Sequence, residues 1–399
     1  HLETNVEISK LNNNITPSGT MAISNKARIL KEQGKPVIGF GAGEPDFPTP
    51  SHVIEEVKIA SENPAYHKYT AVGGLPILRD EISRTTKEYS NFEIDPDNVV
   101  VTNGGKQAIL TTFMSLLDPG DEVLIPSPYW TTYPEAVKIS GGEPVIVNTD
   151  FENDFKVTVE QLEEKFTEKT KVLVWVSPSN PTGVVYSKEE AEEIYNWAFD
   201  KNIWILSDEL YEHLVYEGVT SPSPATIDKN LEKTVVVNGV AKAYSMTGWR
   251  VGWIMGNDDV IGMSKKIQSH ATSNVANISQ VAAYSALKNG LDSTNEMKKA
   301  FDKRRNYALN LFKILENIRV PNATGAFYVF PDVSHYTNGL IDGVSTSIEL
   351  CDWLLEKFYI AFVPGEVFGK EGFLRCSYAL SDQDLEEGLT RFKDALESI

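Results

Sequence analysis

Six short apolar runs recur through the middle of this 399-residue chain, and they constrain its fold more than any other feature. A helical stretch separates most of them. The runs are 99–102, 121–125, 143–147, 171–176, 203–206 and 234–237. Such alternation is typical of a mainly parallel sheet that helices cover on both faces. The sequence therefore predicts an α/β fold.

The segments on either side of these runs predict further elements. An N-terminal helix is expected from Ser18 or Thr20 to Gly34. After the runs, a helical region at 257–318 includes the charged segment 296–305, which we expect to be a solvated helix face. The remainder, 320–399, is predicted to form a smaller α/β unit whose last helix is capped by Ser381. A chain of this length is long enough to form two domains.

Charge and cysteine content exclude several classes of function. The formal net charge of −19 argues against nucleic acid or an anionic membrane as the main partner, since either needs a basic face. Two cysteines, Cys351 and Cys376, are too few for a disulfide framework and indicate a reduced, cytoplasmic setting. No apolar run approaches the roughly 20 residues that span a bilayer. The six histidines show no close ligand spacing, so we expect no metal site.

The stretch 238–256, NGVAKAYSMTGWRVGWIMG, holds Lys242 among glycine and alanine residues and places Arg250 eight residues further on. Little side-chain bulk surrounds the ammonium group, so an aldehyde could reach it, and the arginine could hold an anion carried by that aldehyde. This pattern predicts a Schiff-base lysine with a phosphate clamp. An exposed loop lysine with a surface arginine is the alternative.

Three other places carry polar groups at the ends of predicted strands, where open α/β sheets bind ligands. Gly104-Gly105-Lys106 lies at a strand-to-helix turn, so its backbone N–H groups and the helix dipole would point at an anion. Asp208 ends another run, where a buried carboxylate needs a partner, although it could also be a helix N-cap. Arg375 lies on an otherwise apolar strand and is either paired or functional.

The segment 239–252, GVAKAYSMTGWRVG, resembles the pyridoxal-phosphate attachment signature of class I aminotransferases, and AKAYSMTGWR is closest to the prokaryotic-type aspartate aminotransferase branch. The resemblance runs from about Ser18 to the last helix. It implies fold type I, with a large domain at 49–289 built on a mainly parallel seven-stranded sheet. It also implies a smaller α/β domain made of 1–48 and 290–399, a pyridoxal 5′-phosphate cofactor, and a homodimer with shared active sites.

The resemblance also implies a set of site residues. Those expected to hold the cofactor are Gly104, Gly105, Lys106, Trp130, Asn180, Asp208, Tyr211, Lys242, Arg250 and, reaching across the dimer interface, Tyr69. Those expected to hold the substrate are Gly43, Lys106, Trp130, Asn180, Arg375, Ser18 and Thr20. Lys242, Asp208 and Tyr211 are the expected catalytic residues. For Tyr69, Trp130 and Asn180 the alternatives are a packed loop tyrosine, a core tryptophan and ordinary turn chemistry.

Individual roles follow from the same resemblance. Asp208 pairs with the pyridine nitrogen, Tyr211 and Asn180 donate to the ring oxygen, Trp130 stacks on the ring, and Arg375 grips the substrate α-carboxylate with its bidentate fork. Many relatives carry hydroxyl residues where this chain has glycine and alanine at 239 and 241. The phosphate must therefore rely more on backbone groups, on Arg250 and on Tyr69.

These features predict an aminotransferase that moves the α-amino group of an amino acid to a 2-oxo acid by a ping-pong cycle. In one branch of the family, an arginine of the neighbouring subunit binds the acidic side chain of the substrate. The comparable segment of this chain, 269–274, contains no arginine. Lys106, joined by Ser18 and Thr20, would instead reach the distal carboxylate, unless Lys106 only supplements the phosphate site. Aspartate and glutamate are the expected substrates.

Several other activities remain open. They are prephenate, arogenate, aromatic or alanine specificity, a C–S lyase or decarboxylase on the same fold, and a pyridoxal-binding regulator. A plain dinucleotide-binding fold is opposed by the absence of GxGxxG. The resemblance further predicts cis peptide bonds before Pro128 and Pro181.

Overall fold

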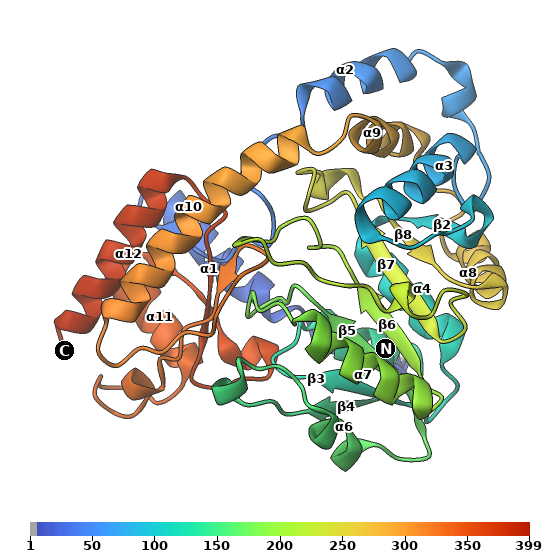
Figure 1. Ribbon diagram of the computed structural model, residues 1–399. Helices are drawn as coiled ribbons and strands as arrows, with labels where there is room; N and C mark the ends of the chain where they lie inside the picture. The colour runs from blue at the N-terminus through green and yellow to red at the C-terminus, as the bar shows by residue number, and fades with distance from the viewer. Residues whose placement is uncertain (1–5) are drawn as a thin grey trace, which may run out of the picture.

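The computed structural model describes residues 6–399, and its largest element is a seven-stranded sheet in the order β2-β8-β7-β6-β5-β3-β4 (Figure 1). The strands are β2 (Val99–Thr102), β3 (Glu122–Pro126), β4 (Glu143–Val147), β5 (Thr170–Val176), β6 (Trp204–Asp208), β7 (Thr234–Gly239) and β8 (Gly252–Met255). β8 alone runs against the others. The predicted α/β fold with a mainly parallel seven-stranded sheet is confirmed.

Helices cover both faces of this sheet, as the alternation predicted. They are α2 (Ser51–Ala60), α3 (Pro76–Thr85), α4 (Gly104–Leu116), α5 (Thr132–Ile139), α6 (Val159–Lys165), α7 (Lys188–Asp200), α8 (Asp258–Ala271) and α9 (Asn277–Lys288). α4 buries Ala108, Ile109 and Phe113 against the central strands. The core on this face contains residues of β2, β3, β5, β6, β7 and β8, so α4 begins at a fixed place above the strand ends.

The remaining elements form a smaller unit beside the sheet. They are α1 (Gly19–Glu32), β1 (Ile38–Gly39), α10 (Asp292–Ile314), β9 (Tyr328–Val329), α11 (Ser347–Phe358), β10 (Ile360–Ala361), β11 (Val363–Pro364), β12 (Leu374–Ser377) and α12 (Asp382–Glu397). β11, β12 and β9 form an antiparallel sheet. In Figure 1 the long α10 runs from beside α9 to this unit.

We propose that the small domain comprises 1–48 with 290–399 and the large domain 49–289; residues 1–5 lie outside the described part. Two observations support this division. β1 pairs in parallel with β10, although more than 300 residues separate them in the chain. Ile38 and Phe40 belong to the same buried cluster as side chains of α10, α11 and α12.

The charged segment of α10 is not simply a solvated face, because two of its arginines are buried. Arg304 forms ion pairs with Asp46 and Asp382 at 2.8 Å, and Arg305 pairs with Asp302 at 3.0 Å. The expectation was wrong for these residues. The acidic partners of Arg304, Asp46 and Asp382, are distant in sequence, so local charge patterning could not reveal them.

Two predicted N-caps differ in outcome. The Ser381 side chain accepts a hydrogen bond from Asp384 N at the start of α12, which confirms that cap. Ser18 occupies the N-cap position of α1, but its hydroxyl makes no capping bond and lies 2.9 Å from the Thr20 hydroxyl instead.

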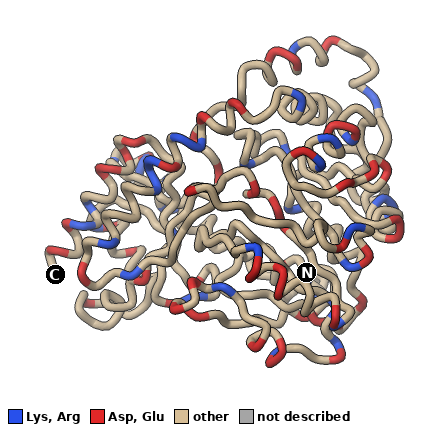
Figure 2. The backbone as a smooth tube through the Cα atoms, viewed as in Figure 1, with Lys and Arg blue, Asp and Glu red and all other residues tan. Residues whose placement is uncertain are grey.

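Charge is spread over the molecule, with acidic side chains along most helices and loops in view (Figure 2). Within residues 6–399, no helix is both long and apolar enough to cross a bilayer, and no group of three or more His, Cys, Asp or Glu side chains could hold a metal ion. Cys351 and Cys376 are both buried and unpaired with each other.

Candidate active site

A cavity of about 1020 Å³ opens at the carboxyl ends of the central strands, where the small unit faces the sheet. Open α/β sheets bind their ligands at this edge. The residues singled out in the sequence that line it are Thr20, Gly43, Gly105, Lys106, Trp130, Asn180, Asp208, Tyr211, Lys242, Arg250 and Arg375. The structure therefore brings most of the predicted site into one place.

Lys242 lies three residues beyond β7, and its Nζ donates a hydrogen bond to the Gly43 carbonyl oxygen. Burial lowers the pKa of Lys242 to about 8; the nearby Arg375 cation acts in the same direction, and the carboxylates of Glu44 and Asp208 oppose it. The amine is therefore much more readily neutral near pH 7 than an ordinary lysine, and a neutral amine is the nucleophilic form.

Asp208 is the last residue of β6 and is buried. Tyr133 donates its phenolic hydrogen to one carboxylate oxygen, and Leu210 N donates to the other at 3.1 Å. Burial raises the pKa of Asp208, which these hydrogen bonds and the Lys242 cation counteract. No regular helix follows Asp208, so the helix N-cap alternative is wrong: the chain continues as a turn.

The first turn of α4 offers an anion site. Its N-cap residue, Asn103, makes no side-chain capping bond, and Gly104 has a φ of +81°. A Cβ added to Gly104 would lie 2.7 Å from Nη2 of Arg250, so only glycine lets the guanidinium pack this closely on the helix start. Uncapped N–H groups beside a guanidinium bind anions.

A second cationic group faces the cavity from β12. Arg375 is buried; its Nη1 donates to Asn180 Oδ1 and its Nη2 to the Gly41 carbonyl oxygen, both at 3.0 Å. Its guanidinium lies 4.4 Å from the centre of the Tyr328 ring. The buried Nε has no hydrogen-bond partner among the described residues. The two hydrogen bonds from Nη1 and Nη2 go to neutral oxygen atoms, so the guanidinium charge remains available to an anionic ligand in the cavity.

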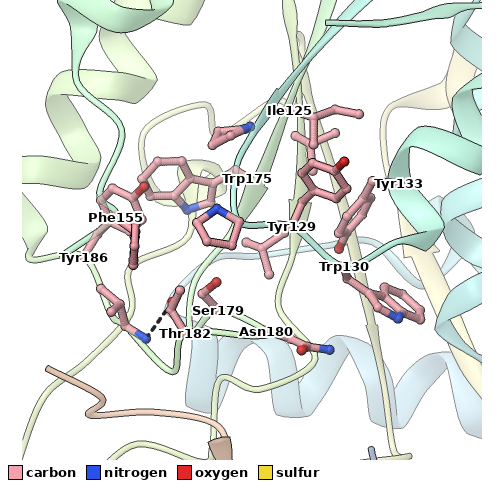
Figure 3. Close-up of a pocket in the computed structure, with 15 residues that line it drawn as sticks. Ile125, Tyr129, Trp130, Tyr133, Phe155, Trp175, Ser179, Asn180, Thr182 and Tyr186 are labelled. Atoms are coloured by element: carbon pink, nitrogen blue, oxygen red, sulfur yellow. Dashed lines mark hydrogen bonds between the residues drawn. The ribbon is translucent and has the colours of Figure 1, made fainter. Parts of the chain in front are cut away.

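Trp130 lines both this cavity and a smaller one of about 40 Å³, whose lining residues are drawn in Figure 3. Tyr133 and Asn180 line both cavities as well. Trp130 meets Tyr133 edge to face at 5.8 Å, and Lys106 Nζ lies 5.3 Å from the centre of the Trp130 ring. Burial, then the Arg250 charge, lowers the pKa of Lys106. These contacts hold the Trp130 indole in place before any ligand binds.

Three predicted site residues do not line the cavity. Gly104 lies behind Arg250, and Ser18 contacts Thr20 only through their hydroxyls. The Tyr69 side chain is 89% exposed. Tyr69 therefore contributes nothing to the cavity of its own chain. The predicted cis bonds before Pro128 and Pro181 are confirmed, and Ser177-Pro178 is also cis.

Glu44, Tyr133, Thr247 and Tyr328 are among the cavity residues that the sequence analysis did not predict. The Tyr328 hydroxyl lies 2.8 Å from that of Tyr211. Tyr133 follows Trp130 by three residues, close to one helical turn, and that spacing was the available signal. Thr247 lies inside the stretch 238–256 and Glu44 directly follows the predicted substrate residue Gly43, but nothing local indicated that Glu44 and Thr247 contact each other.

These groups fit pyridoxal phosphate. The cofactor needs an amine for its aldehyde, an anion site for its phosphate and an acid for its pyridine nitrogen. Lys242 supplies the amine, the N-terminus of α4 with Arg250 supplies the anion site, and buried Asp208 supplies the acid. All of them face one cavity. The fold and the cavity thus define a pyridoxal-phosphate enzyme of fold type I.

Comparison with known proteins names the family. The profile of aminotransferase class I and II matches residues 35–392. An aspartate aminotransferase of Streptomyces avermitilis is 49% identical over 96% of this chain and 94% of that protein. A probable aspartate/prephenate aminotransferase of Aquifex aeolicus is 42% identical over 96% and 97%. The chain belongs to the class I and II aminotransferase family.

Solved structures agree with this assignment. The aspartate aminotransferase from Rhizobium meliloti superposes with a TM-score of 0.93 at 36% identity, covering 98% of this chain and 99% of that one. The aspartate aminotransferase from Thermus thermophilus with maleate gives 0.92 at 37% identity, covering 98% and 99%.

Proposed function

We propose that this protein is an aspartate aminotransferase, which moves the α-amino group of aspartate or glutamate to a 2-oxo acid. One observation carries the proposal: a single cavity places the Lys242 amine between Asp208 and Arg375, with the Lys106 cation on its wall. A dicarboxylic amino acid presents two carboxylates, and Arg375 and Lys106 are the two cations of the cavity that complement them. The name of the relative from Streptomyces avermitilis supports the same substrate.

Pyridoxal phosphate bound here supplies the electron sink that accepts the electrons of the substrate Cα–H bond. Asp208 would keep a proton on the pyridine nitrogen, while Tyr211 and Asn180 would hold the phenolic oxygen. The N–H groups of Gly105 and Lys106 would hold the phosphate with Arg250, and Trp130 would stack on the ring.

The substrate is held and deprotonated by side chains of this chain. Arg375 would bind the α-carboxylate through its guanidinium fork, and so turn the Cα hydrogen toward Lys242. Neutral Lys242 Nζ then takes the Cα proton as a general base, which its lowered pKa favours. Thr20 of α1, which lines the cavity, would join Lys106 at the distal carboxylate, and Ser18 would join them when the small domain closes; Gly43 borders the substrate.

A half-reaction screen tests this function. The cofactor-loaded enzyme is mixed with each amino acid in turn, and the loss of its near-visible absorbance is followed. Aspartate and glutamate should react fastest. Loss of absorbance only with cysteine or cystathionine, accompanied by pyruvate release, would replace the aminotransferase with a C–S lyase. Prephenate is the second acceptor to test, because the relative from Aquifex aeolicus carries that name.

Replacing Lys106 with alanine should weaken the use of aspartate by roughly 30- to 1000-fold in kcat/KM, as for losing one partner of a buried charge pair, about 2–4 kcal/mol. Alanine and phenylalanine turnover should barely change, because neither has a distal carboxylate. Steady-state kinetics with the three amino acids measures this, with the exposed Lys313→Ala as the matched control. An equal fall for all substrates, together with weaker cofactor binding, would assign Lys106 to the phosphate.

Tyr69 should act in trans in a homodimer, since its exposed ring lies outside its own chain's cavity. Mixed dimers of Tyr69→Phe and Lys242→Ala chains place both defects in one site and leave the other site intact. Such hybrids should recover about half the native activity per dimer, whereas each parent dimer lacks an intact site. A monomer by sedimentation, or hybrids no more active than the parents, would remove the idea.

We further propose a cytoplasmic location, which the two buried, unpaired cysteines support.

A further inference from the structure

The segment 40–49, which follows β1, joins the two units of the molecule. Its first residues are fixed to the small unit: Phe40 N donates to the Ala361 carbonyl oxygen at 2.7 Å, and Arg375 Nη2 donates to the Gly41 carbonyl oxygen at 3.0 Å. One end of this segment is thus attached to the arginine assigned to the substrate.

Its later residues are attached to the segment 242–250 of the large unit. Hydrogen bonds join Lys242 to Gly43, Ser245 to Phe47, Thr49 to Ser245 and Trp249 to Thr49. The two strand-to-loop segments that face the cavity therefore form one hydrogen-bonded pair. Movement of either segment changes the position of the other.

Glu44 makes the contact of greatest consequence in this pair. The Thr247 hydroxyl donates to Glu44 Oε2 at 2.6 Å, while the Thr247 carbonyl oxygen accepts from Arg250 Nη1 at 3.1 Å. A single threonine thus bonds both the loop carboxylate and the guanidinium beside the α4 terminus. The Lys242–Gly43 bond is lost whenever the amine is bonded to a cofactor, but the Glu44–Thr247 bond does not depend on the state of Lys242.

We propose that Glu44 is a positioning residue of the reaction: its carboxylate fastens the loop after β1 to Thr247 and so keeps Gly43 and Arg250 in a fixed relation while Lys242 changes partners. The inference rests on the proposed function. Lys242 is faced by Arg375 from β12, by Arg250, by Asp208 from β6 and by Glu44.

The test uses the cofactor-loaded enzyme and four variants. Glu44→Ala removes the acceptor, Thr247→Val removes the donor at nearly constant volume, and Glu44→Gln keeps an oxygen that accepts from Thr247. Glu316→Ala, an exposed glutamate after α10, is the matched control. Hydrogen exchange of residues 43–49 and the rate of cofactor release on dilution are measured for each.

Glu44→Ala and Thr247→Val should each speed exchange in 43–49 and cofactor release about tenfold, the scale for losing a hydrogen bond to a charged group. Glu44→Gln and Glu316→Ala should stay within about twofold of the native protein. Unchanged exchange and release in both loss variants would overturn the proposal, as would Glu44→Gln behaving like Glu44→Ala. Native enzyme that fails to transfer the amino group of aspartate would instead overturn the proposed function.

Discussion

Lys242→Ala should lower the rate of amino transfer from aspartate by roughly 10⁵-fold or more, the scale for removing the central nucleophile of an enzyme. The alanine side chain can neither attach the cofactor aldehyde nor take the Cα proton, so two roles are lost together. Stopped-flow absorbance with aspartate measures the rate. Borohydride treatment provides a second readout, because it should fix the cofactor covalently to the native chain and not to the variant.

The exposed Lys313→Ala serves as the control and should behave like the native chain. A borohydride-stable adduct on Lys242→Ala would show that another lysine carries the cofactor. The pH dependence tests the assignment independently. The pKa of Lys242 is lowered to about 8, so the rate of cofactor attachment to cofactor-free protein should rise about tenfold per pH unit below that value and level off above it.

The sequence was sufficient for the fold because the sheet is built from continuous apolar runs. Four of the six predicted runs match a strand to within one residue at each end, and the strands matching 203–206 and 234–237 extend two residues further, to Asp208 and Gly239. A buried parallel strand needs apolar residues on both faces, which makes it visible in local sequence. β8 has the same burial but follows an irregular loop and begins with glycine, so its pairing between β2 and β7 could not be read locally.

The candidate site, like the fold, was predictable from the sequence only in part. Asp208 ends a strand, and Lys242 and the glycines at 104–105 lie within three residues of a strand end, so their place at the sheet edge was predictable. The hydrogen-bond partners of the site residues could not be predicted. Tyr133 reaches Asp208 across 75 residues and Thr247 reaches Glu44 across 203, and contacts at such separations depend on the packed fold rather than on a local pattern.

Asp208→Asn should leave the fold intact and lower the rate of the half-reaction with aspartate by roughly 10³-fold, or about 4 kcal/mol of transition-state stabilisation. The amide has nearly the same shape but carries no negative charge, so it cannot hold a proton on the pyridine nitrogen. Circular dichroism and thermal melting check the fold, and stopped-flow absorbance measures the half-reaction. The exposed Asp200→Asn is the matched control.

Tyr133→Phe tests how much the orientation of the Asp208 carboxylate matters apart from its charge. It keeps the Asp208 charge but removes the hydroxyl donor to Oδ2, leaving Leu210 N on the other oxygen. A hydrogen bond to a charged group contributes about 1.5–3 kcal/mol, so the half-reaction should fall by roughly 10- to 100-fold, less than for Asp208→Asn. Near-native turnover of Asp208→Asn would show that the carboxylate only closes the turn after β6. A larger loss in Tyr133→Phe than in Asp208→Asn would mean that the tyrosine acts on the ligand directly rather than through Asp208.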